Sequence, residues 1–352
     1  TQDIMDTGLA LQLVQALQRL DDLLRGFATA LATLVETHAS TTMAARTHAQ
    51  HAVPTTFGAK AAVFLREVLR HRDRLRELRP RACQVSLHGA AGTSAALGPR
   101  ASAIRGEMAD RLGLQASAVP WHVSRDAVAE FAALCALTAA TSSRWAREVI
   151  DLSRTEIGEV SEPRGHHRGA SSTMPQKANA ILSEAIIGMA VTNGSLASAA
   201  YRAMEAGHER AAGEWHVEWQ VVPQMAVLAA SSLALAAEVA EGLVVLPDTM
   251  RRNLDLDSGL VMSEAHMMRL APDLGRERAH DVVYEAAVAA RRSGRGLNEE
   301  TAAAFESATG SEAYVSTVTP DEYLGDVANV CSEALARWEE SVHRDGVGGS
   351  AS

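Results

Sequence analysis

The sequence predicts an all-α protein in which long helices form a bundle and a small helical domain follows on the C-terminal side. Two apolar stripes at helical spacing support this, and no alternating apolar and polar run of useful length predicts a β-sheet. The first stripe lies on one long helix and comprises Leu9, Leu13, Leu17, Leu20, Leu24, Phe27, Leu31 and Leu34. The second comprises Phe57, Ala61, Phe64, Val68, His71, Leu75 and Leu78, and we expect Pro80 to end it.

Further helical patterns follow at about 125–153, 175–205 and 214–243. The composition changes near Leu246-Pro247-Asp248, beyond which shorter helical pieces are separated by proline and glycine. We therefore assign residues 1–246 to a helical-bundle domain and residues 247–345 to a C-terminal helical domain. The Gly- and Ser-rich residues 346–352 are predicted to form a disordered tail.

Composition and charge narrow the classes of function. The 352 residues suffice for a large core, and the net charge of −10 argues against nucleic acid as a partner. We find no signal peptide and no apolar run long enough to cross a membrane. The three cysteines lack Cys-x-x-Cys spacing, which indicates a reducing, cytoplasmic compartment and no zinc site. A solvated face or ion pairs between subunits are the favoured interpretation of the arginines on the second helix: Arg66, Arg70, Arg72, Arg74, Arg76 and Arg79.

The most informative segment is the loop Gly169–Asn179, which combines small residues, adjacent hydroxyls and a positive charge. Its first two residues add little bulk, so the backbone is free to move. Pro175 suits the first turn of a helix. A helix that begins there directs free N–H groups toward Ser171 and Ser172, and Lys177 adds a full positive charge. The segment therefore predicts a mobile anion-binding loop that carries a nucleophile or base.

This loop resembles the signature Gly-Ser-Ser-x-Met-Pro-x-Lys-x-Asn of the fumarase/aspartase superfamily. Residues 45–58 resemble its Gly-Arg-Thr-His-x-Gln-x-Ala-x-Pro block, in which His48 matches the active-site histidine. Residues 1–7 resemble a carboxylate-binding block, usually Thr-Ser-x-Asp, in which Thr1 matches the second hydroxyl. Because members of the superfamily carry a further domain before this block, we expect that N-terminal domain to be absent here.

The resemblance implies a helical bundle of the fumarase/aspartase type and an elimination next to a carboxylate. Removal of the C–H proton moves electrons into that carboxylate, and the resulting aci-carboxylate needs fixed positive charge and N–H donors. By resemblance, Ser171 is the base, His48 serves or orients the leaving group, and Lys177 stabilises the intermediate. The residues expected to hold the substrate are Thr1, Gln2, Thr47, Gln50, Thr93, Ser172, Met174, Asn179 and Arg210. No metal or organic cofactor is implied.

Within the superfamily the chain most resembles the 3-carboxy-cis,cis-muconate lactonizing enzymes, or cycloisomerases, through residues 87–93, 120–126, 207–219 and 259–265. Ala178 departs from the arginine usual in those enzymes. The alternative is therefore a lyase that releases fumarate from a substituted succinate, for example nitrosuccinate lyase. Adenylosuccinate lyase ranks lower, because Trp219 replaces an arginine usual there. A non-catalytic scaffold is disfavoured by the complete set of Ser171, Lys177, Asn179 and His48.

Assembly follows from the same motifs. The segments 1–7, 45–58 and 169–179 are expected on different long helices, so they cannot all meet within one chain. The apolar stripes are also too long for one chain to cover. We therefore predict a homotetramer whose shared active sites each combine these three segments from different subunits. The Ser171 loop is expected to be the most mobile part without ligand, and the substrate is a small carboxylate.

Overall fold

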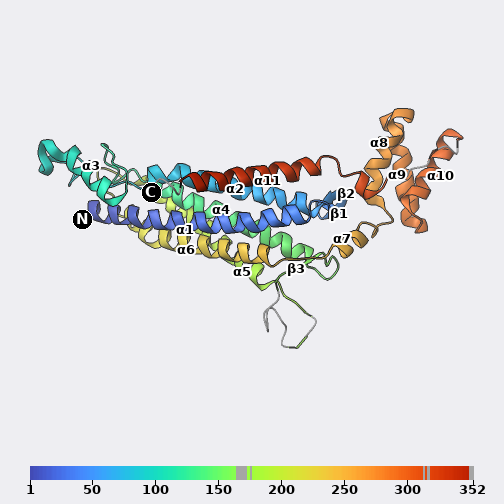
Figure 1. Ribbon diagram of the computed structural model, residues 1–352, viewed down its shortest axis with the longest axis horizontal. Coiled ribbons are helices and arrows are strands. Elements are labelled where there is room, and N and C mark those ends of the chain that lie inside the picture. Colours follow the sequence, from blue (N-terminus) through green and yellow to red (C-terminus); the bar gives the residue numbers. More distant parts are fainter. Residues whose placement is uncertain (164–172, 175–176, 312–313, 315–317, 349–352) are drawn as a thin grey trace.

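The structure is a computed structural model that describes residues 1–163, 173–174, 177–311, 314 and 318–348. Figure 1 shows an elongated bundle of long helices that run side by side, with smaller elements at both ends. The bundle helices are α1 (Gln2–Thr37), α2 (Phe57–Ala82), α4 (Asp126–Leu152), α5 (Ile181–Arg202) and α6 (Glu214–Glu241). The predicted all-α fold of long helices is confirmed.

The apolar stripe of α1 forms the centre of the core. Leu17, Leu24 and Phe27 are fully buried. Helix α1 packs against α2 and α6, and α4 packs against α2, α5 and α6. The Trp145 ring of α4 meets Phe64 of α2 edge-on, with ring centroids 5.1 Å apart. The helical spacing of apolar residues therefore becomes a continuous buried seam along the bundle.

One end of the bundle, which we call the amino end, holds Thr1, the 84–94 loop, η1 (Ala95–Arg100) and α3 (Ala101–Leu112) (Figure 1). The short helix η2 (Ala203–Glu205) follows α5. The 84–94 loop lies against the segment that precedes α4. Gly92 has a φ of +78°, and an added Cβ there would come within 2.9 Å of Pro120. Only glycine fits this close approach.

The opposite end, which we call the hairpin end, contains strands that the sequence analysis did not expect. Strands β1 (Thr42–Thr47) and β2 (Gln50–Thr56) form an antiparallel hairpin in which Thr47 pairs with Gln50. The turn residues His48 and Ala49 have φ of 49° and 62°, as the tight turns of such hairpins require. A register shift near Ala44 breaks the alternation, which explains why periodicity missed these strands. Strands β3 (Val160–Ser161) and β4 (Val244–Val245) pair nearby.

Beyond α7 (Pro247–Asn253), the chain forms a group of shorter helices with apolar clusters of their own. Helix α9 packs against both α8 and α10. This group contains η3 (Leu260–Met262), α8 (Ser263–Leu274), α9 (Arg276–Ser293), α10 (Leu297–Thr309) and η4 (Pro320–Glu322). The boundary near residue 246 stays a prediction.

The last helix, α11 (Val327–Gly348), returns along the bundle and packs against α2 and α1. Residues 327–345, which the sequence analysis assigned to the C-terminal domain, therefore contact the bundle. Helix α11 also extends into the predicted tail, whose residues 349–352 lie outside the described part of the chain.

Arg72 of α2 holds α11 in place. Its fully buried guanidinium donates to Asp21 at 2.7 and 2.8 Å, to Ser341 at 2.8 Å and to Asp345 at 2.9 Å. The sequence analysis interpreted the arginine cluster as a solvated face or as ion pairs between subunits. For Arg72 that interpretation is wrong. A side chain that joins three helices within one chain cannot be recognised from helical spacing alone.

Two predicted helix boundaries were wrong. Helix α5 begins at Ile181 rather than at Pro175, because the Glu162 carboxylate accepts hydrogen bonds from the N–H groups of Leu182 and Ser183 at 3.2 and 2.7 Å. Helix α2 continues past Pro80 to Ala82. Proline this close to a C-terminus removes only one hydrogen bond near the helix end.

The expectation of no membrane-length apolar run was also wrong. Residues 181–205 and 214–241 are long and apolar enough to cross a membrane, judged by length and composition alone. Both helices pack in the bundle, where Asn193 of α5 and Glu218 of α6 are buried. Their outward faces expose Val191 and Val227. A helix that is apolar on several sides is typical of the centre of a larger assembly.

Candidate active site

The amino end carries Thr1, Gln2, Thr93 and Arg210 from the predicted substrate-binding set. Thr1 and Thr93 are exposed, and half-buried Arg210 donates to the Gly89 carbonyl at 2.6 Å. Gln2 is buried, and its Nε2 donates to Asp6 at 3.1 Å and to the His122 carbonyl at 2.8 Å. Because this amide nitrogen already joins α1 to the segment before α4, contact of Gln2 with substrate stays a prediction.

Asp3 links the segments that carry these residues. Its carboxylate accepts hydrogen bonds from Ser86 Oγ at 3.0 Å, from the backbone N–H of His88 and Gly89 at 3.2 and 2.8 Å, and from the His122 ring at 2.5 Å. Burial by itself raises the pKa of Asp3, but these hydrogen bonds outweigh it and lower the pKa to about 2. The carboxylate is therefore ionised at neutral pH.

A buried charge network fixes the start of α6 at the amino end. Arg125 donates to Glu218 at 2.8 and 2.5 Å and to Asp6 at 3.1 Å. Burial raises the pKa of Glu218, although the Arg125 charge opposes that shift. Trp219 directly follows Glu218 in the sequence; it is 44% exposed, and its ring centroid lies 4.9 Å from that of Trp215. The aromatic residue Trp219 therefore stands at the position where adenylosuccinate lyases usually carry an arginine.

The hairpin end presents His48 at the tip of the β1–β2 turn, with exposed Thr47 and Gln50 beside it. Arg46 anchors this hairpin, because its guanidinium donates to both carboxylate oxygens of Glu159 at 2.9 and 2.6 Å. Glu159 is completely buried and also accepts a hydrogen bond from Asn253 at 2.8 Å. The turn that carries His48 is therefore held in place by the largely buried Arg46–Glu159 ion pair.

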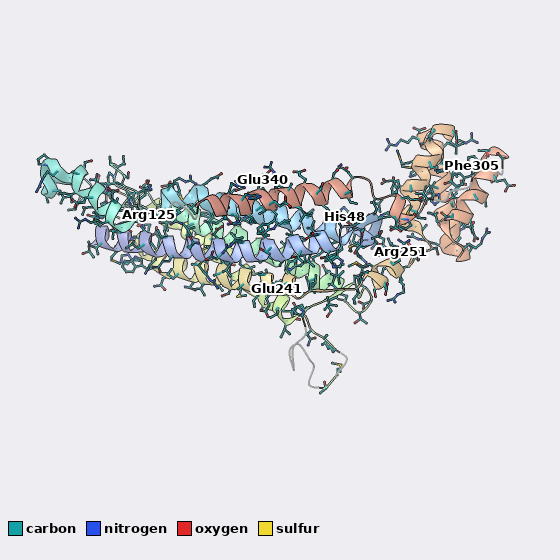
Figure 2. All side chains as sticks on the ribbon, viewed as in Figure 1. His48, Arg125, Glu241, Arg251, Phe305 and Glu340 are labelled. Carbon is teal, nitrogen blue, oxygen red and sulfur yellow. The ribbon has the colours of Figure 1, made fainter. Side chains whose placement is uncertain are left out.

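A second contact holds the base of the hairpin. The Thr42 hydroxyl donates to Asp321 at 2.5 Å, and Arg251 of α7 donates to the same carboxylate at 2.9 and 2.8 Å. The Thr42 hydrogen bond and Arg251 lower the pKa of Asp321. Figure 2 shows His48 and Arg251 at the same end of the molecule. The short helical group thereby contacts the strand that leads to His48.

Lys177, Ala178 and Asn179 line a cleft with a volume of 350 Å³, together with Glu162 and Leu246. Lys177 is exposed, and its backbone N–H donates to the carbonyl of Met174, which is itself exposed, at 3.0 Å. Ser171 and Ser172, predicted as base and substrate-binding residue, lie outside the described residues. Helix α5 begins at Ile181, and the N–H groups of Leu182 and Ser183 in its first turn donate to Glu162. These N–H groups are therefore not free to face Ser171 and Ser172 in the way that the sequence analysis predicted.

The segment Gly158–Val160 connects the cleft to the hairpin, because Gly158 and Val160 line the cleft while Glu159 holds Arg46. Thr1 lies at the other end of α1, a helix of 36 residues that spans roughly 54 Å at 1.5 Å per residue. Figure 2 likewise places His48 and Arg125, whose guanidinium contacts Asp6, at opposite ends of the bundle. One chain does not bring the Thr1 and His48 segments together.

Sequence reasoning missed Asp3, His122, Glu159 and Glu162. Asp3 lies in the 1–7 segment and His122 in the 120–126 segment, and both segments carry the family resemblance. The available signal was that each segment contains a polar residue able to pair with the other. Glu159 and Glu162 stand in a stretch without a motif, and their roles depend on which backbone N–H groups and arginines the fold brings to them.

The profile of a family described as "Lyase" matches residues 1–192, and that of "Adenylosuccinate lyase C-terminus" matches residues 259–334. A 3-carboxy-cis,cis-muconate cycloisomerase of Pseudomonas aeruginosa is 43% identical over 339 residues, which cover 96% of this chain and 74% of that protein. A nitrosuccinate lyase of Streptomyces davaonensis is 39% identical over 358 residues, which cover 98% and 75%.

Among solved structures, a 3-carboxy-cis,cis-muconate lactonizing enzyme from Pseudomonas putida superposes with a TM-score of 0.88 at 38% identity, and the match covers 96% of this chain and 76% of that one. The long-helix bundle, the polar loops at its ends and these matches together identify the protein as a lyase. The chain belongs to the fumarase/aspartase superfamily, as the resemblance of its motifs predicted.

Proposed function

We propose that this enzyme catalyses elimination and its reverse, addition, on a small carboxylate, as a 3-carboxy-cis,cis-muconate cycloisomerase. The observation that carries this proposal is 43% identity over 96% of the chain to a relative of that activity. The predicted residues Thr1, His48, Thr93, Lys177, Asn179 and Arg210 support it, because each lies at an end of the bundle or in the Lys177 cleft rather than in the apolar core.

The chemistry divides between these groups. Ser171 takes the proton next to a substrate carboxylate, and Lys177 and Asn179 stabilise the aci-carboxylate that forms. His48, held on the hairpin by the Arg46–Glu159 pair, serves or orients the oxygen that leaves or attacks. Thr1, Thr93 and Arg210 hold carboxylates by hydrogen bonds at the amino end. The chain's own side chains supply each of these roles.

A complete site then requires more than one subunit. The His48 and Thr1 segments are separated by the length of α1, so a second chain has to bring one to the other. We infer a homotetramer with sites shared between subunits, in which the exposed apolar faces of α5 and α6 are covered. The three free, buried cysteines support a cytoplasmic location.

The test is an absorbance assay of the purified protein with 3-carboxy-cis,cis-muconate, in which loss of the conjugated diene reports lactonization. Wild-type protein is expected to turn over, and the His48→Gln variant to lose at least about a hundredfold in kcat. Absence of turnover by a folded wild-type enzyme excludes this substrate.

A substituted-succinate lyase is the second candidate, and Ala178 favours it. An arginine at that position pairs with a carboxylate in two parallel hydrogen bonds, and alanine cannot. The 39% identity to a nitrosuccinate lyase over 98% of the chain supports the same alternative. Release of fumarate, followed by its ultraviolet absorbance, separates the two candidates when nitrosuccinate is compared directly with the muconate. Adenylosuccinate belongs in the same panel as the lower-ranked substrate.

A further inference from the structure

We propose that Asp3 is the positioning residue that assembles the carboxylate-binding half of the active site at the amino end. This inference rests on the proposed function for the identity of the ligand, a carboxylate. The claim that Asp3 positions the surrounding segments rests only on the hydrogen bonds of Asp3. Asp3 follows Thr1 by two residues on α1, and its carboxylate meets both the 84–94 loop and His122.

The residues that bind substrate at this end come from three separate pieces of chain. Thr1 begins α1, Thr93 lies in the 84–94 loop, and Arg210 lies between η2 and α6. The last two pieces are loops, so no regular helix fixes their positions relative to α1. A carboxylate that is recognised by several donors requires those donors within a few tenths of an ångström of one geometry. Side-chain contacts between α1 and these loops must therefore align them.

Asp3 provides that alignment for the 84–94 loop. It accepts from two successive backbone N–H groups, His88 and Gly89, and from the Ser86 hydroxyl, so the loop is attached at three points. The backbone N–H of Ser94 then donates to the His88 carbonyl at 2.8 Å and closes the loop around Thr93. Movement of Asp3 would move every one of these contacts.

The same carboxylate is linked to Arg210 through Gly89, and it contacts the segment that precedes α4 directly. Arg210 donates to the carbonyl of Gly89, whose N–H donates to Asp3, so the single residue Gly89 links Asp3 to Arg210. The His122 ring bonds Asp3 while the His122 carbonyl accepts from Gln2, which ties the segment before α4 to the first turn of α1. Asp3, two residues after Thr1, thus contacts the loop that carries Thr93 directly and is linked to Arg210 through Gly89.

Asp3→Asn is the test, because asparagine keeps the size of the side chain but turns one acceptor oxygen into a donor that faces other donors. We expect KM to rise by about tenfold or more while kcat stays within about threefold, since substrate is held less well but Ser171 and His48 are untouched. A merely structural role gives another result: fewer folded molecules, hence a lower apparent kcat with an unchanged KM.

Hydrogen exchange of a peptide covering residues 84–94 reports positioning without any substrate. In Asp3→Asn the His88 and Gly89 amides are expected to exchange at least about tenfold faster. Asp22→Asn is the matched control, since Asp22 is an exposed carboxylate on the same helix that pairs with Arg25. Neither its KM nor its exchange is expected to change.

If Asp3→Asn does not fold, His122→Gln removes only one of the four contacts and should give smaller changes of the same sign. Unchanged KM and unchanged exchange in a folded Asp3→Asn enzyme overturn the proposal. A wild-type protein inactive on the whole substrate panel instead overturns the proposed function, and the exchange experiment still decides whether Asp3 holds the loop.

Discussion

At the scale of single residues, the proposed chemistry depends on the hydroxyl of Ser171, which lies outside the described residues. Ser171→Ala is expected to lower kcat by about a thousandfold, because the elimination loses its base. Ser172→Ala is the matched control on the adjacent hydroxyl, where loss of one hydrogen bond to substrate should raise KM by roughly five- to tenfold. Steady-state kinetics of both variants provide the measurement. Near-normal kcat in Ser171→Ala, with an intact fold by circular dichroism, would remove the base role from this residue.

At the scale of elements, the helices were predictable wherever burial alone decides the structure. The Leu stripe of α1 and the Phe57–Leu78 stripe of α2 each face one core, so spacing was sufficient information. The start of α5 was not predictable, because Glu162, 19 residues before Ile181 in sequence, satisfies its first N–H groups. The β1–β2 hairpin was missed because a register shift near Ala44 breaks the alternation, and its anchors Glu159 and Asp321 lie far away in the sequence. For the site, motifs predicted which side chains matter, whereas their anchors depend on tertiary contacts.

The hairpin turn gives an element-scale prediction. Ala49 has a φ of 62°, where a β-branched side chain is strained and glycine is not. Ala49→Val is expected to destabilise the protein by about 1–3 kcal/mol and to lower kcat, because the turn positions His48. Ala49→Gly should keep wild-type or slightly higher stability. Urea denaturation and kcat measurements on both variants test this, and equal behaviour of the two would mean that the turn conformation does not matter.

A buried histidine between α2 and α4 is expected to make the stability of the folded protein depend on pH. His71 is buried and bonds Thr141 at 2.8 Å, and burial, with a contribution from Arg74, lowers the pKa of His71 from 6.5 to about 4. Between these values the unfolded chain takes up a proton that the folded chain does not, so stability present above pH 6.5 is lost as pH falls toward 4. From pH 7 to 5 this group should cost about 2 kcal/mol. His71→Gln should reduce that loss, as compared by urea denaturation at both pH values; identical pH slopes would contradict the assignment.

At the scale of the whole molecule, the separation of the two ends of the bundle decides how sites are built. Thr1 precedes the 36-residue helix α1, and His48 lies beyond the opposite end of that helix, so any site that uses both needs at least two chains. The exposed Val191 and Val227 on α5 and α6 are apolar surface of the kind that subunit contacts cover. Sedimentation of the protein should therefore show an assembly rather than a monomer, and a tetramer if the homotetramer inferred above is correct.

Complementation tests whether His48 and Ser171 reach one site from different subunits. His48→Ala and Ser171→Ala proteins are each expected to be nearly inactive. If the two residues of a site come from different chains, random reassembly of equal amounts should give about a quarter of the sites both intact side chains, and activity should recover to that fraction. If both residues come from one chain, every chain carries a defect and mixing restores nothing. Subunit exchange is verified with two affinity tags, and a self-mixed sample of each variant controls for recovery during reassembly. Absence of recovery in verified mixed tetramers would show that His48 and Ser171 of one chain serve the same site, leaving only the Thr1 segment to come from a neighbour.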